Sequence, residues 1–111
     1  MFEQLIKKII RGEKKDGEID LSFVGDKKIH ELNKKFRKKD KPTDVLSFNY
    51  DEGKVLGDVI ISRETTRRNA KRYGVTYNDE VKRLVIHGTL HVLGYDHGRR
   101  MRHAEEIYSQ L

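Results

Sequence analysis

VIHGTLHVLGYDH, residues 85–97, holds three histidines and two glycines within thirteen residues. On a helix His87 and His91 lie roughly 40° apart around the axis, so their imidazoles can converge on one metal ion. Gly94 can adopt a left-handed conformation and reverse the chain, which would bring His97 back towards the pair. The spacing therefore predicts a three-histidine metal site. Three protein ligands leave one coordination position open, which is typical of catalytic zinc.

The alternative interpretation is that the three histidines are hydrogen-bonded polar residues in or beside the core. A single histidine in an apolar helix is usually of that kind, but three at this spacing, with a glycine turn between them, favour a metal. The chain has no cysteine, so metal ligands must come from histidine, aspartate or glutamate.

Gly88 distinguishes this stretch from a metalloprotease helix, whose pattern is H-E-x-x-H-x-x-G-x-x-H. In that pattern the glutamate after the first histidine takes a proton from zinc-bound water. A glycine inside an apolar helix costs roughly 1 kcal/mol relative to alanine, so it suggests either close packing against another element or the approach of a substrate backbone. Both readings disfavour a conventional protease.

The composition fits one domain over residues 1–111, because the chain is too short for two hydrophobic cores. The 24 lysines and arginines exceed the 18 acidic residues, and the net charge of +6 favours a polyanionic partner, above all nucleic acid. The alternative is a well-solvated surface. No apolar run approaches the roughly 20 residues of a membrane span, so we expect a cytoplasmic protein that does not bind membranes, and we favour a monomer.

Hydrophobic periodicity predicts how the chain is organised. Apolar residues at helical spacing predict helices at residues 2–12, 26–36, 63–74, 78–94 and 99–111. Alternating or β-branched runs predict strands at residues 19–24, 45–48 and 55–62, and the short linker between the last two favours a hairpin. Asp26 and Ser62 suit helix N-caps. We therefore expect an α/β or α+β fold with a small mixed sheet of three or four strands and four or five helices, including a central helix like that of zinc hydrolases.

Three motifs occur in order along the chain: KDKPTDVLSF, LGDVIIS and HGTLHVLGYDH. With them the chain resembles the YbeY family of bacterial ribosomal RNA maturation factors, described as metal-dependent, single-strand-specific endoribonucleases. The resemblance covers about residues 19 to 108. The chain is shorter than the family in its N-terminal region, in the loop NYDEGK and in its C-terminal tail.

The resemblance implies one zinc ion per chain, held by His87, His91 and His97 at the base of a positively charged cleft. It also implies a functionally essential arginine just before the K-P-T motif, which falls on Arg37. The implied partners are precursor ribosomal RNA and the small ribosomal subunit, with roles in maturation of the 16S 3′ end and in ribosome quality control.

From these residues we expect Arg37 to pair with the scissile phosphate and to stabilise charge developing there. Asp96 beside His97 is either a second catalytic residue, orienting a ligand or accepting a proton, or the cap of the last helix. We expect Asp44 and Asp58 to brace the structure. The candidates for RNA contact are Lys38, Lys39, Lys41, Ser47, Arg67 and Lys71. For the residues of segment 63–73, a solvated face is the alternative.

Two other functions stay open at this point. One is a metal hydrolase acting on peptides or small molecules, although the missing glutamate and the basic surface count against it. The other is a non-catalytic ribosome-assembly factor whose metal is structural and whose basic face binds RNA.

Overall fold

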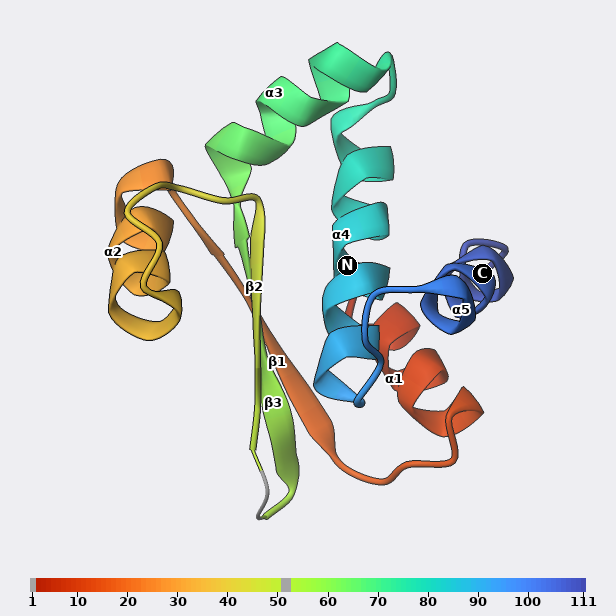
Figure 1. Cartoon of the computed structure of the whole chain (residues 1–111). Coiled ribbons are helices and arrows are strands. Elements are labelled where there is room, and N and C mark those ends of the chain that lie inside the picture. The colour runs from red at the N-terminus through yellow and green to blue at the C-terminus, as the bar shows by residue number, and fades with distance from the viewer. Residues whose placement is uncertain (1, 51–52) are drawn as a thin grey trace.

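The computed structural model describes residues 2–50 and 53–111 and shows a mixed α/β fold, as the sequence predicts (Figure 1). Within these residues a three-stranded sheet carries helices on both faces. The elements in chain order are α1 (Glu3–Gly12), β1 (Glu18–Val24), α2 (Asp26–Arg37), β2 (Val45–Asn49), β3 (Val55–Ser62), α3 (Arg63–Tyr73), α4 (Tyr77–Val92) and α5 (Arg99–Tyr108).

The strand order in the sheet is β1-β3-β2. β2 and β3 pair antiparallel, which confirms the predicted hairpin; Asp51 and Glu52 of its linker lie outside the described residues. β1 pairs parallel with β3, so the chain must cross over between them, and α2 lies on that crossover. β3 is therefore the central strand, and Val59 and Ile61 on it are fully buried.

α4 lies at the centre of the larger layer of helices, between the sheet and helices α1 and α5 (Figure 1). Its apolar residues point in almost every direction because it packs on the sheet along one side and on other helices along the rest. Two clusters of buried side chains fill these contacts. The first cluster, against the sheet, contains Ile6, Ile10, Ile19, Val59, Ile61, Val81, Leu84, Val85 and Val92. The second cluster, among the helices, contains Ile9, Ile86, Leu90, Met101, Ala104 and Tyr108.

The expected caps are only partly correct. The Ser62 hydroxyl accepts a hydrogen bond of 3.3 Å from the Thr65 amide and caps α3 as expected. Asp26 is not the N-cap, because Gly25 occupies that position and Asp26 is the first residue of α2. Gly25 makes no side-chain capping bond. The Asp26 carboxylate instead accepts hydrogen bonds from the hydroxyls of Ser62 and Thr65 and from Arg68, at 2.6 to 2.7 Å. Ser62 at the N-cap of α3, and Thr65 and Arg68 on α3 itself, thus supply the donors to a carboxylate on α2.

Hydrogen bonding sets the pKa of this carboxyl group. Burial alone would raise the pKa of Asp26, but the hydrogen bonds from Thr65, Ser62 and Arg68 outweigh burial and lower it to about 2. The ionised carboxylate therefore joins the N-termini of α2 and α3.

α4 begins one or two residues earlier than expected. Its N-cap is Thr76, whose hydroxyl accepts a bond of 3.0 Å from the Asp79 amide, so the helix starts at Tyr77 rather than at Asn78 or Asp79. It ends at Val92 with Leu93 as its C-cap, and Gly94, which the sequence predicts to end the helix, follows with a positive φ. None of the helices in the described ranges is long and apolar enough to cross a membrane.

Candidate metal centre

The end of α4 turns the chain back towards its own last two turns. The Tyr95 amide bonds to the Leu90 carbonyl and the Gly94 amide to the His91 carbonyl, both at 3.0 Å, which is the pattern of a Schellman motif. Gly94 has the positive φ of +103° that this motif requires. The turn directs the following segment, with His97, back over the helix.

The structure brings His87, His91 and His97 together. One ring nitrogen from each lies within 4.8 Å of the others. The ring centroids are separated by 4.6 Å between His87 and His91, 4.7 Å between His91 and His97, and 5.4 Å between His87 and His97. The first two residues are half-buried and His97 is exposed, so the group faces solvent on one side. Three imidazoles at this separation could hold a metal ion, and such a donor set suits zinc.

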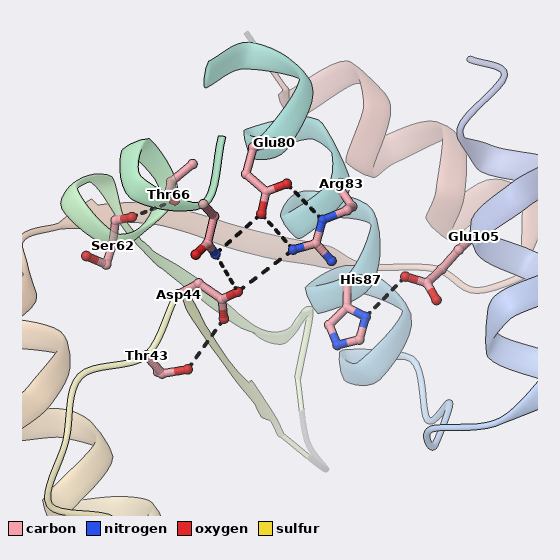
Figure 2. A network of polar contacts seen from close by, with 9 residues as sticks. Thr43, Asp44, Ser62, Thr66, Glu80, Arg83, His87 and Glu105 are labelled. Carbon is pink, nitrogen blue, oxygen red and sulfur yellow. Dashed lines mark hydrogen bonds and ion pairs between the residues drawn. The ribbon is translucent and has the colours of Figure 1, made fainter. Parts of the chain in front are cut away.

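The second ring nitrogens of His87 and His91 already have partners. His87 Nδ1 lies 3.1 Å from Glu105 Oε2 on α5 (Figure 2), and His91 Nδ1 lies 2.8 Å from the Tyr95 carbonyl. These contacts hold the two rings so that their Nε2 atoms remain for a metal. Burial, followed by repulsion from His87, holds the pKa of His91 below its ordinary value, so its imidazole stays neutral and able to coordinate.

A pair of tyrosines anchors the turn. The Tyr95 phenol donates a bond of 2.7 Å to Glu13 Oε1, and the Tyr108 phenol donates to the other oxygen of the same carboxylate. Glu13 directly follows α1, so this group, the Glu13 clamp, joins three distant parts of the chain. Sequence reasoning missed Glu13, Tyr95 and Glu105, because only helix packing brings them to the histidines.

Gly88 is explained by packing. A Cβ atom at this position would lie 2.7 Å from Val59 Cγ1 and 3.1 Å from Ser47 Oγ, so α4 approaches the sheet closely here. The Ser47 hydroxyl also donates a bond of 3.1 Å to the Gly88 carbonyl. Of the two readings of this glycine, the structure supports close packing. The Cβ atom of a glutamate at this position would already clash with Val59 of the sheet, before the rest of its side chain is placed.

Arg37 and the three histidines line one cavity of about 700 Å³. Arg37 ends α2, its guanidinium donates to the Ser47 carbonyl, and it lies 4.9 Å from the centre of the Phe48 ring. This cavity, the metal cavity, is also lined by Lys39, Lys41, Ser47 and Asp96.

Three other expected RNA contacts lie elsewhere on the described surface. Lys38 follows α2 in a left-handed conformation and is not part of the cavity wall. Arg67 and Lys71 lie on α3, and Arg67 packs 5.5 Å from the centre of the Tyr77 ring. The metal cavity thus gathers only part of the predicted basic set.

Asp96 is not the cap of the last helix. The N-cap of α5 is Gly98, which makes no side-chain capping bond. Asp96 lines the metal cavity beside His97, and among the described residues its carboxylate has no hydrogen-bond partner. This position leaves it as a candidate for proton transfer or for orienting a ligand.

A polar network braces the wall of the cavity (Figure 2). Arg83 donates two bonds, of 2.9 and 2.6 Å, to the buried carboxylate of Glu80 and lies 3.9 Å from Asp44. Asn69 donates to Asp44 at 3.2 Å. Asp44 therefore has the bracing role expected for it, and so does Asp58, which accepts the phenol hydroxyl of Tyr50.

The fold and this site define a class: a small mixed α/β protein in which three histidines that could hold a metal ion line a cavity together with basic side chains. A family model described as endoribonuclease YbeY matches residues 1–110. The chain belongs to this family.

Curated relatives named endoribonuclease YbeY include one from Aquifex aeolicus, 52% identical, with 72% of this chain and 56% of the relative covered. Another, from Persephonella marina, is 45% identical over a match that covers 83% of this chain and 64% of the relative. A third, from Desulfitobacterium hafniense, is 40% identical over a match that covers 100% of this chain and 83% of the relative. The chain thus spans less than two thirds of the length of the first two.

The chain is also similar to solved structures. The solution structure of TM1509 from Thermotoga maritima has a TM-score of 0.73 and 31% identity, with 98% of this chain and 77% of that one covered. The mixed α/β architecture is therefore shared with a protein of known structure.

Proposed function

We propose that this protein is a zinc-dependent endoribonuclease that cleaves single-stranded RNA. The observation that carries the proposal is that Arg37 and the three clustered histidines line one cavity. The names of the curated relatives support the same activity. The position of Gly88 against the sheet argues against a peptidase, because the usual glutamate has no room there.

His87, His91 and His97 would hold the zinc ion, and the contacts of the first two with Glu105 and Tyr95 orient their rings for it. Bound there, zinc would act as a Lewis acid and would lower the pKa of a coordinated water towards 7. Metal chemistry of this kind needs no glutamate beside His87.

Arg37 holds the phosphate at the bond to be cleaved. A guanidinium has five N–H donors, and the bond to the Ser47 carbonyl fixes its position with donors to spare. A planar cation pairs well with two phosphate oxygens and stabilises the extra negative charge of the transition state. In the reaction, water adds to phosphorus as the bond to the leaving ribose oxygen breaks. Asp96, which lines the cavity, accepts the proton that the water loses, and the leaving oxygen takes a proton from solvent.

The substrate we propose is ribosomal RNA, reached on the small ribosomal subunit in the cytoplasm, with roles in maturation of the 16S 3′ end and in ribosome quality control. Family membership supports this choice, and the net charge of +6 favours a polyanion. Lys39 and Lys41 would contact the backbone inside the metal cavity. Lys38, Arg67 and Lys71 would contact the RNA backbone outside the metal cavity.

The test is cleavage of a labelled single-stranded RNA by the wild type, Arg37→Ala and Lys28→Gln, each purified without chelators. Arg37→Ala should lose about 100-fold or more of the cleavage rate while keeping its zinc, since removing one such charge stabiliser has an effect of this size. Lys28 is an exposed cation of the same helix outside the metal cavity, so its variant should cleave like the wild type.

A His91→Ala protein taken through the same purification reports any contaminating ribonuclease. Cleavage of equal rate by this variant would refute the proposal, as would an Arg37→Ala protein that cleaves normally. A casein digestion assay tests the peptidase alternative, and we expect no digestion.

A further inference from the structure

A second cavity, of about 490 Å³, lies on the other side of the turn that carries His97. Gly94, Tyr95, Asp96 and His97 line both this cavity and the metal cavity. The turn is therefore a shared wall, and the exposed His97 ring stands between two hollows. A ligand that fills the metal cavity and extends past His97 enters the second one.

Basic side chains are prominent in both cavities. Arg37, Lys39 and Lys41 line the metal cavity, and the second cavity is lined by Lys15, Arg99 and Arg100. Two carboxylates, Glu13 and Asp96, also line the second cavity. Both oxygens of Glu13 accept phenol hydroxyls, and the carboxylate keeps its negative charge. The lining of the second cavity therefore carries three cations against two carboxylates.

The three cations of the second cavity have few partners within residues 2–50 and 53–111. Lys15, Arg99 and Arg100 form no ion pair or side-chain hydrogen bond there. The two arginines are exposed and occupy the first turn of α5, where the helix dipole repels positive charge. Their placement does not stabilise the helix, and two adjacent exposed guanidinium groups suit an anionic ligand.

We infer that the second cavity holds the RNA strand beyond the cleaved bond, with Lys15, Arg99 and Arg100 contacting its phosphates. The inference rests on the proposed function, because it takes RNA to be the ligand of the metal cavity. An endonuclease must hold its strand on both sides of the reacting phosphate. Basic grooves that follow the backbone are the usual means of holding a single strand. With His97 between two basic cavities, the strand crosses the metal group and continues over the start of α5.

The test compares binding of two single-stranded RNAs, of about four and about twelve nucleotides, by fluorescence anisotropy over a range of salt concentrations. Both RNAs carry 2′-O-methyl riboses, which resist cleavage and keep the phosphate charges. The proteins are the zinc-loaded wild type, an Arg99→Gln/Arg100→Gln double variant and a Lys28→Gln/Arg102→Gln double variant. Both double variants lose two positive charges. Lys28 and Arg102 are exposed and line neither cavity, which makes them the matched control. Thermal unfolding checks that all three proteins are folded, and a gel checks that the RNA stays intact.

The Arg99→Gln/Arg100→Gln protein should bind the long RNA more weakly, and its plot of log affinity against log salt should be shallower by about 1.4, which is about 0.7 for each lost contact. Its affinity for the short RNA should change less than its affinity for the long RNA, because fewer phosphates of the short RNA can reach the second cavity. The control should resemble the wild type with both RNAs.

Equal binding of the long RNA by the two double variants would overturn the inference, even if the wild type cleaves RNA as proposed. A wild type that does not cleave, but whose binding of the long RNA depends on Arg99 and Arg100, would refute the nuclease and support the second cavity as an RNA contact.

Discussion

The phenol of Tyr95 donates a hydrogen bond of 2.7 Å to Glu13, a residue 82 positions earlier in the chain. The backbone carbonyl of Tyr95 is at the same time the partner of His91 Nδ1. The end of α1 therefore determines, through one tyrosine, how a candidate metal ligand is oriented.

Replacing Tyr95 with phenylalanine should reduce zinc affinity by about 10-fold, because outer partners of metal ligands contribute 10- to 100-fold and this one acts through a backbone carbonyl. Tyr108→Phe is the matched control: it removes the other phenol from Glu13 but leaves the turn after α4 intact. Competition with a zinc indicator measures affinity, and urea unfolding of the metal-free proteins measures stability. If both variants lost zinc affinity equally, the Glu13 clamp would act only through general stability.

Glu105→Ala should lower zinc affinity by about 10- to 100-fold, because His87 Nδ1 would lose the carboxylate that orients its ring. Glu106→Ala serves as the control, since its side chain is exposed and makes no contact with the histidines. Isothermal titration with zinc gives both affinities. Identical affinities for the two variants would show that the Glu105 contact does not support metal binding.

Gly88→Ala should destabilise the protein although alanine favours helices by roughly 1 kcal/mol. The added methyl group would lie 2.7 Å from Val59 Cγ1, and overpacking of this kind costs about 1–3 kcal/mol. A Val59→Ala change should make room for it, so the double variant should lose less stability than the sum of the single variants. Urea unfolding of all four proteins tests this, and purely additive effects would contradict a steric role.

Asp26→Asn should make stability less dependent on acid pH. The folded-state pKa of Asp26, about 2, lies below its ordinary value of 3.8. Ionised Asp26 therefore stabilises the fold above about pH 4, and this contribution is lost as the pH falls towards 2. The variant should be less stable than the wild type by up to about 2 kcal/mol at neutral pH, and the difference should shrink near pH 2. A constant difference over this range would mean that ionisation of Asp26 does not contribute.

The sequence was sufficient for features that a few neighbouring residues determine. Ser62 caps α3, Gly74 follows its last residue in a left-handed conformation, and the spacing of His87 and His91 places both on one face of α4. The prediction of Asp26 as an N-cap was wrong, because Ser62 and Thr65, far along the chain, supply the donors that bind its carboxylate.

Features that depend on packing gave no local signal. β1 pairs in parallel with β3, although α2 and β2 separate the two strands in the chain. Hydrophobic periodicity therefore predicted both strands but not that they pair with each other. Glu105 reaches His87, and Glu13 reaches Tyr95, only after α1 and α5 have packed against α4. Gly88 was noticed as unusual, yet the choice between its two explanations needed the position of Val59.

The contact between His87 and Glu105 also sets an order for biosynthesis. A chain made from its N-terminus presents Glu13 first, the three histidines next and Glu105 last. His87 acquires its orienting carboxylate only once α5 has been synthesised and has packed on α4. A nascent chain that ends before α5 thus carries all three histidines without the carboxylate that orients His87, and the candidate metal group is complete only with the last helix.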